Sequence, residues 1–303
     1  MNKRLHDMVI AEHIKISDHF LSGLVPVFNI MEQVNSANTT EKITIDFTHA
    51  SFVTPIFVLP LMIFLKGAKH KVVTSNTTEY LSVIKWEKGL IADEMRLSTF
   101  KALIEGFSSK TYIPVISFPA SNDSEDIKNQ ILTAVENLLI RQGRIETNVA
   151  TGIKYMIEEC VDNITQHSKS ERGYIFAQAY PHKQYIDICI ADNGITLLGS
   201  YHENNDFDIG TDLEAIQAAN RGISTKNLPN AENRGYGIIT SKRMLVNGLN
   251  GSFVMISGKS MFLYNKDINK FIDLPNGLKC PGTVVAMRIP YQNKNFNYIN
   301  YVE

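Results

Sequence analysis

The chain has 303 residues, of which 44% are hydrophobic and 20% are charged, and its formal net charge is −1. This composition is typical of a globular protein and excludes a disordered or membrane-embedded chain. A net charge near zero, without any run of Lys or Arg, gives no reason to expect a nucleic-acid partner. The length is sufficient for two domains of ordinary size.

The sequence also bears on the cellular compartment. The first 13 residues lack the apolar core of a secretory signal peptide. The longest apolar run, residues 52–65, contains two prolines and is too short to cross a bilayer, so we expect it in a protein core. Three cysteines, Cys160, Cys189 and Cys280, show no metal-ligand or C-x-x-C spacing. We therefore expect a cytoplasmic protein with no membrane contact, no disulfide framework and no zinc site.

The first third of the chain predicts a small α/β unit. In chain order, the pattern predicts a helix over 15–35 capped by Ser17 or Asp18, a strand over 42–47, a helix from Thr54–Pro55 to 66, a strand over 70–74 and a helix over 78–86. Strand, helix and strand in this order form a βαβ unit with parallel pairing.

This first unit resembles a degenerate STAS domain, the fold of anti-sigma-factor antagonists. Asp46–Phe47 match the strand end of that fold, and Phe52–Val53 match its loop. The position of the family's phosphoacceptor serine falls in Thr54–Pro55–Ile56–Phe57, where Thr54 is the only hydroxyl. The resemblance therefore implies a protein-interaction module more than a phosphorylation target. An unrelated α/β domain stays open as the alternative.

The rest of the chain predicts a larger α+β unit. We expect helices over 95–107, 127–142, 151–168, 211–219 and 238–246, and strands over 111–118, 173–180, 185–192, 252–257, 261–265 and 283–289. Pro114 lacks a backbone donor, so we expect the strand over 111–118 at a sheet edge. The predicted domains are 1–112 and 113–303, and the predicted fold class is α+β.

Two polar residues stand out on the helix over 151–168. Glu159 and Asn163 are one turn apart at the edge of an apolar stripe, so both side chains project the same way. A carboxylate in a cleft can act on a water, and an amide oxygen can bind a hard cation. An isolated E-x-x-x-N is more often an ordinary surface pair, so the pattern needs support from elsewhere in the chain.

Three further patterns follow. Asp192 ends a strand before Asn193–Gly194, which can turn a carboxylate into a pocket while the glycine lets the backbone approach a flat ligand. Residues 196–233 are polar and rich in glycine, as expected of a mobile segment or lid. Gly235–Tyr236–Gly237 then opens a helix, which is typical of an anion site. Each pattern alone is weak, and none is a Walker A loop or a dinucleotide fingerprint.

The joint order of these motifs closely resembles the GHKL nucleotide-binding fold of gyrase, mismatch-repair, heat-shock chaperone and histidine-kinase ATPases. Residues 159–163 match its N-box, 192–196 and 235–237 match its two glycine boxes, and 282–283 match its final Gly-Thr. The sequence from Ile157 to His167 looks most like the anti-sigma-factor serine kinases. The resemblance implies a two-layer α/β sandwich for 113–303. One departure is Thr196, where the family usually has a glycine.

The resemblance implies roles for the matched residues. Asn163 would coordinate Mg²⁺ between the phosphates, and Glu159 would activate the attacking water or hydroxyl. Asp192 would accept the adenine amino group, with support from Thr283 through water. The remaining implied ligand contacts come from Gly194 and Ile195 at the adenine ring, Gly235, Tyr236 and Gly237 at the phosphates, and Lys226 or Arg234 at the γ-phosphate. His167 is either a packed side chain or a further nucleotide contact.

From these residues we predict an ATP-binding regulatory protein. It would hydrolyse ATP slowly or transfer phosphate to a protein Ser or Thr in a partner-switching system, with ATP and Mg²⁺ as cofactors and a protein partner at the N-terminal domain. The alternative is a non-catalytic switch in which the nucleotide only sets the arrangement of lid and domains. A sensor histidine kinase is excluded because none of the eight histidines has the required H-[DE]-x-x-[TN]-P context. A homodimer stays open.

Overall fold

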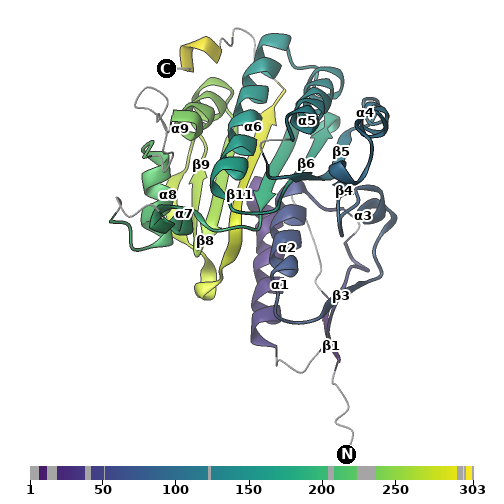
Figure 1. Ribbon diagram of the computed structural model, residues 1–303, viewed down its shortest axis with the longest axis vertical. Coiled ribbons are helices and arrows are strands. Elements are labelled where there is room, and N and C mark those ends of the chain that lie inside the picture. Colours follow the sequence, from purple (N-terminus) through teal and green to yellow (C-terminus); the bar gives the residue numbers. More distant parts are fainter. Residues whose placement is uncertain are drawn as a thin grey trace, which may run out of the picture.

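The computed structural model describes residues 7–11, 19–37, 42–50, 52–121, 124–203, 208–223, 236–291, 296 and 298–301. Strands of these residues form two sheets, one with three strands and one with eight, and the helices pack against both (Figure 1). The predicted α+β class is therefore confirmed. Within the described ranges, no helix combines the length and the apolar character needed to cross a membrane.

The smaller sheet is parallel throughout. It contains β1 (Asp7–Ala11), β2 (Lys42–Asp46) and β3 (Val72–Ser75) in the order β1-β2-β3. Its helices are α1 (Leu24–Ser36), which follows the short η1 (Phe20–Gly23), α2 (Pro55–Lys66) and α3 (Glu79–Val83). Because α2 joins the parallel strands β2 and β3, the predicted βαβ unit is confirmed. Proline at the first helical position explains why α2 begins where it does.

The larger sheet has the strand order β10-β9-β8-β11-β7-β6-β5-β4. Only the β4–β5 pair is parallel, and the other neighbours are antiparallel. The strands are β4 (Leu90–Ile91), β5 (Tyr112–Pro119), β6 (Arg172–Tyr180), β7 (Tyr185–Asp192), β8 (Ser252–Gly258), β9 (Ser260–Tyr264), β10 (Asn269–Asp273) and β11 (Cys280–Pro290). All but the first residue of β6 and of β7 are buried, so both faces of the sheet centre are covered.

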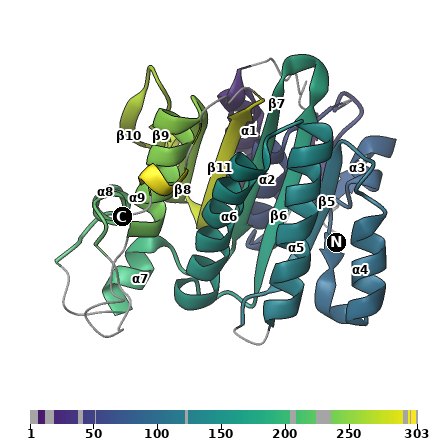
Figure 2. The ribbon, with the colours of Figure 1, turned by 90° about the horizontal axis from the view of Figure 1, so that it is seen from above.

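Helices lie on both faces of this sheet, as Figure 2 shows from above. One face carries α5 (Glu125–Asn137) with the π turn η4 (Leu138–Gln142), α6 (Thr147–His167), and α9 (Tyr236–Arg243) with the π turn η6 (Met244–Gly248). The other face carries α1 and α2. Further helical segments are η2 (Ala92–Glu94), α4 (Leu97–Glu105), η5 (Pro181–Lys183), α7 (Leu197–Glu203), α8 (Asp212–Asn220), η7 (Pro275–Gly277) and η8 (Tyr298–Tyr301).

Helix α2 lies between the two sheets. Every residue from Pro55 to Phe64 is buried, which is the behaviour of a helix that is apolar on all sides. It contacts β7, β11 and β6 of the large sheet, and α1 packs beside it. Its side chains belong to a core that also contains Phe176 of β6 and Val284 of β11. The N-terminal unit and the large sheet therefore share one hydrophobic core.

Several sequence expectations need correction. β5 is not an edge strand, because β4 pairs with it at Ile116 and Ser117. The register is irregular between Ile113 and Ile116, and this irregularity accommodates Pro114, which has no N–H to donate. β4 precedes residue 112, so the large sheet includes chain from both sides of the expected domain boundary. The expected caps Ser17 and Asp18 lie outside the described residues.

The described part of the polar stretch after β7 contains a helix that was not expected. This part forms α7 and α8, of which only α8 was expected. A reciprocal capping box between Thr211 and Glu214 starts α8. Ala215 and Ile216 are fully buried, so this helix packs against the protein rather than projecting from it.

Candidate functional site

A pocket lies between α6 and the ends of β7 and β11. Five residues named from the sequence line it together, although they are far apart in the chain: Glu159, Asn163, Asp192, Ile195 and Thr283. Its cavity is about 60 Å³ in this structure. An apolar cavity that holds benzene is about 150 Å³, so a purine would enter only if part of the wall moved.

Asp192 is the best-defined polar group of the pocket. It ends β7, its side chain is 2% exposed, and its Oδ1 accepts the Gly194 N–H at 2.9 Å. The N–H of Thr283 also donates to the carboxylate. Burial raises the pKa of Asp192 to about 7, and the two backbone donors only partly oppose that shift. Among the described residues no cationic side chain pairs with Asp192. Its buried carboxyl therefore borders the pocket and accepts hydrogen bonds from backbone N–H groups alone.

The segment beside Asp192 is held close by a glycine. Gly282 has φ +63°, and a Cβ at this position would lie 2.2 Å from the backbone oxygen of Asp192. The following residue, Thr283, has its Oγ1 3.1 Å from the Oγ of Ser257. Ser257 in turn accepts the N–H of Leu197 at 2.9 Å. Strands β7 and β11 thus place a carboxyl and a hydroxyl at one polar edge of the pocket, and Ser257 of β8 contacts the Thr283 hydroxyl without lining the pocket.

The wall that the sheet forms is apolar. Ile195 stands on the loop after β7, and the sheet supplies further apolar side chains: Ile190, Phe253, Met255 and Val285. Such a surface, with a few polar groups at one edge, suits a flat ring that carries hydrogen-bonding groups on its rim.

Gly194 packs closely against the backbone of Ser168 at the end of α6. A Cβ at Gly194 would lie 1.9 Å from the backbone oxygen of Ser168, which follows α6. The N–H of Ile195 donates to the same oxygen at 2.7 Å. The glycine therefore allows the loop after β7 to approach the end of α6. This packing contact is one reason for a glycine at this position, and its expected role beside a ligand stays a prediction.

Glu159 and Asn163 project from α6 into the pocket, as their spacing predicts. The hydroxyl of Tyr155, one turn earlier, donates a hydrogen bond to the Glu159 carboxylate. Burial and this carboxylate raise the pKa of Tyr155 to about 12, so the phenol stays protonated as a donor. A Cβ on Gly237 would lie 1.9 Å from Oε2 of Glu159. The first turn of α9 therefore rests directly against this carboxylate.

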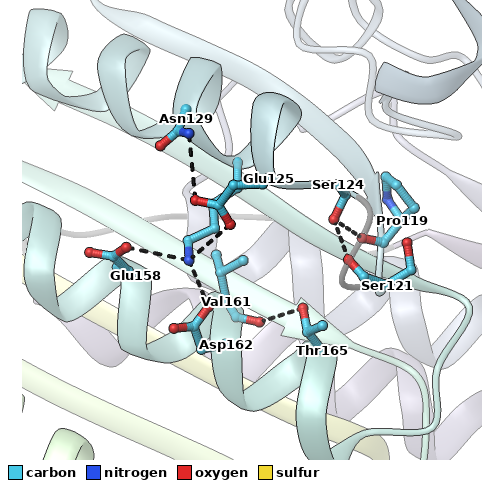
Figure 3. Close-up of polar contacts among 10 residues, drawn as sticks. Pro119, Ser121, Ser124, Glu125, Asn129, Glu158, Val161, Asp162 and Thr165 are labelled. Atoms are coloured by element: carbon cyan, nitrogen blue, oxygen red, sulfur yellow. Dashed lines mark hydrogen bonds and ion pairs between the residues drawn. The ribbon is translucent and has the colours of Figure 1, made fainter.

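The neighbouring acids of α6 pair with α5. The ammonium of Lys128 on α5 lies 2.8 Å from Asp162 Oδ1 and 3.3 Å from Glu158 Oε1. Glu125 joins the same cluster at 3.7 Å (Figure 3). Helix α6 therefore has one acidic edge used in ion pairs with α5 and another edge in the pocket.

Metal binding at the pocket would depend on Asn163. Within the described residues, no three His, Cys, Asp or Glu side chains come together as a metal site. A magnesium ion in proteins often takes only one or two protein ligands and completes its shell with phosphates and water. The pocket fits that pattern with the Asn163 amide oxygen as the protein ligand, and does not fit a metal held by protein alone.

Not every predicted residue can be placed. Lys226, Arg234 and Gly235 lie outside the described residues, and of Tyr236 only the backbone, at the start of α9, is described. His167 lines the pocket. Thr54, the one hydroxyl at the expected phosphoacceptor position, is only 4% exposed.

Sequence reasoning missed one polar residue that lines the pocket and two that contact pocket residues without lining it. Ser241 of α9 lines the pocket, and its hydroxyl is buried without a partner in the described structure. Tyr155 and Ser257 support Glu159 and Thr283 from behind. Tyr155 could have been found from its position four residues before Glu159. Nothing in the sequence distinguishes Ser241 or Ser257 from other serines.

A search for related proteins finds none. The chain matches no protein-family model, no curated protein and no solved structure. A functional proposal for this chain must therefore come from its own residues and from the order of its motifs.

Proposed function

We propose that the pocket binds ATP with Mg²⁺ and that the protein is an ATP-binding regulator of the GHKL type. The buried carboxyl of Asp192 carries the proposal. It accepts two backbone N–H groups, has no cationic partner among the described residues and borders a cavity whose sheet wall is apolar. The amino group of adenine supplies the kind of donor that this carboxyl lacks.

The proposed orientation follows from the two ends of the pocket. Adenine would lie against Ile195 with its amino group at Asp192 and Thr283. The phosphates would then extend towards Glu159, Asn163 and the first described turn of α9, and the N-terminal end of a helix favours anions. Asn163 would hold Mg²⁺ against the phosphates, which supplies the charge neutralisation that phosphoryl transfer requires.

The proposed chemistry is slow hydrolysis or transfer of the γ-phosphate to a protein Ser or Thr. Glu159 would take a proton from the attacking water or hydroxyl, with its carboxylate oriented by Tyr155. A protein partner would bind at the N-terminal unit, which we propose to be STAS-like. Because Thr54 is buried, it would not be the acceptor hydroxyl.

One observation favours the second candidate, a switch without turnover. Gly237 packs on Glu159, and the cavity is only about 60 Å³. Nucleotide entry would therefore separate α9 from α6 to some extent. A displacement of α9 could by itself report nucleotide binding to a partner, without a chemical step.

Binding is tested with Asp192→Asn and a matched control on α6. We expect ATP affinity to fall at least tenfold in Asp192→Asn, because the amide presents only one acceptor oxygen where the carboxylate has two. The control variant Asp162→Asn lacks an acid that faces α5. We expect it to bind ATP with the affinity of the unchanged chain. Isothermal titration calorimetry measures both. Equal affinity of the two variants would show that the adenine pocket has been assigned wrongly.

Turnover is tested with the adjacent pair Glu159→Gln and Glu158→Gln. If Glu159 is the base, phosphate release or labelling of a protein falls by a factor of 10² or more in Glu159→Gln, in line with the usual loss on removing a general base, of roughly 10² to 10⁴. Glu158→Gln should retain activity, because its side chain faces Lys128. ATP binding without any product in the unchanged protein would instead establish the switch.

A further inference from the structure

A second hollow, the interunit groove, lies where the N-terminal unit meets the large sheet. It is formed by the ends of α1 and α2, the loop after β7 and the segment that enters β11. Its volume is about 570 Å³. Sites for small organic ligands usually measure about 300 to 1,000 Å³, so the groove has the size of such a site.

The groove is basic. Lys69, His70 and Lys279 line it, and none of the described residues in its lining is acidic. Neither lysine forms an ion pair with another described residue. The Nδ1 of His70 is shielded from solvent and has no partner in the described structure. A buried N–H without an acceptor is more costly than an unused lone pair, so we expect the ring proton on Nε2, which makes His70 a third donor.

The groove also has apolar lining. Val34 and Phe64 come from the N-terminal helices, and Ile195 and Pro281 come from the large unit. Basic donors beside an apolar surface complement a ligand with an anionic end and an apolar body. We propose that the interunit groove binds a small organic anion, a phosphate or carboxylate on an apolar body.

The groove adjoins the nucleotide pocket. Ile195 and Thr196 line both. Gly282 lines the groove, and its backbone packs on Asp192 in the pocket. A ligand that shifts this shared wall changes the affinity for nucleotide, and nucleotide changes the affinity for that ligand by the same factor. This coupling, unlike the groove site itself, rests on the proposed function.

Phenyl phosphate is a suitable probe because it combines an aromatic ring with a phosphate. We compare the full chain with the double variant Lys69→Gln/Lys279→Gln and with a control of equal charge, Lys266→Gln/Lys270→Gln, on the exposed β9–β10 hairpin. We expect the groove variant to bind at least tenfold more weakly and the control to bind as the unchanged chain does. Equal affinities in all three chains, or no binding to any, would overturn the proposal.

The location of the probe is followed by NMR. Phenyl phosphate should shift the imidazole resonances of His70 and leave those of His182, on the distant β6–β7 turn, in place. It should also bind to Asp192→Asn, in which the nucleotide pocket is impaired. If the probe leaves His70 unchanged, or if Asp192→Asn abolishes its binding, the probe occupies the nucleotide pocket and the groove proposal fails.

The coupling has its own measurement. Adenosine, which has no phosphate to compete for the basic groove, is titrated with and without saturating phenyl phosphate, and we expect its affinity to change at least threefold. An unchanged affinity would overturn the coupling. If phenyl phosphate binds at His70 but adenosine does not bind at all, the proposed nucleotide function and the coupling fail while the groove site stands.

Discussion

Two buried carboxyls on β7 show how differently a protein can hold an acid. Asp187 is fully buried, and Arg288 meets it with two hydrogen bonds of 2.7 Å each. The Arg288 guanidinium also lies 3.7 Å from the centre of the Tyr185 ring. Asp192, five residues further along the strand, has only backbone donors. An acid kept in so unfavourable a setting is more often part of a binding site than of a scaffold.

The setting of Asp192 predicts a pH dependence of stability. Its pKa is about 7 in the folded chain against 3.8 for the free side chain, so the folded state binds the proton more tightly. The folded state is therefore favoured most at low pH, and this contribution is lost as the pH rises from about 4 to about 7. Relative to Asp192→Asn, the unchanged chain should lose up to roughly 4 kcal/mol of unfolding free energy over this range.

Urea denaturation of both chains at pH 5 and pH 8 measures this effect. Working with the difference between the two chains removes the contributions of all other titrating groups, Asp187 included. A difference in unfolding free energy that stays constant with pH would show that Asp192 is not buried as described.

Tyr155 gives a second prediction at this scale. Tyr155→Phe keeps the ring but removes the donor to Glu159. Loss of a hydrogen bond to a charged group, worth about 1.5 kcal/mol or more, should reduce turnover roughly tenfold while ATP affinity is unchanged. The acid limb of the pH–rate profile should move to higher pH, since the carboxylate loses a stabilising donor. In Tyr264→Phe, which removes a hydroxyl that bonds Asn247 and does not line the pocket, all three quantities should stay the same.

Two glycines at element ends should respond differently to an added methyl group. Gly194→Ala would drive a Cβ into the backbone oxygen of Ser168, which cannot move without opening the end of α6. Gly237→Ala would meet the carboxylate of Glu159, the far end of a flexible side chain. We expect a loss of about 3 kcal/mol for Gly194→Ala and less than about 1 kcal/mol for Gly237→Ala, with reduced turnover in the latter. Thermal unfolding and phosphate release measure the pair, and equal stability losses would contradict the two packings.

The elements that are predicted correctly from the sequence show a regular spacing of apolar residues within their own segment. Helix α6 shows a regular apolar stripe, and the β6–β7 hairpin shows alternation on both sides of a turn. β10 was missed because it is an exposed edge strand that depends on β9 for its pairing. β4 has only two residues, too few for any period. Such elements form because a neighbour offers hydrogen bonds, which local sequence does not record.

The residues of the candidate site also differ in whether the sequence alone can locate them. Residues attached to a regular element, such as Glu159 on α6 and Asp192 at the end of β7, could be located from spacing and strand ends. The contact between Gly194 and Ser168 could not, because it depends on how a loop and a helix end meet in space. Nor could the interunit groove, whose lining comes from two units that the sequence treats as separate.

For the whole molecule, the shared core predicts a single unfolding transition. Trp86, the only tryptophan, is 3% exposed and reports on the N-terminal unit, whereas far-UV circular dichroism is dominated by the large unit. Because α2 contacts the large sheet, both signals should change at the same urea concentration. Phe57→Ala should shift both together by about 3 to 5 kcal/mol. An earlier transition in the tryptophan signal would mean that the two units unfold separately.

The position of α2 has a consequence for synthesis on the ribosome. Roughly 210 residues separate the end of α2 at Lys66 from the start of β11 at Cys280, one of the strands that cover it. At the usual rate of about 5 to 20 residues per second, these residues take about 10 to 40 seconds to translate. Until β11 is made, the nascent chain carries an apolar helix whose cover is incomplete. Chaperone binding to the N-terminal segment during translation should therefore decide how much native protein a cell obtains.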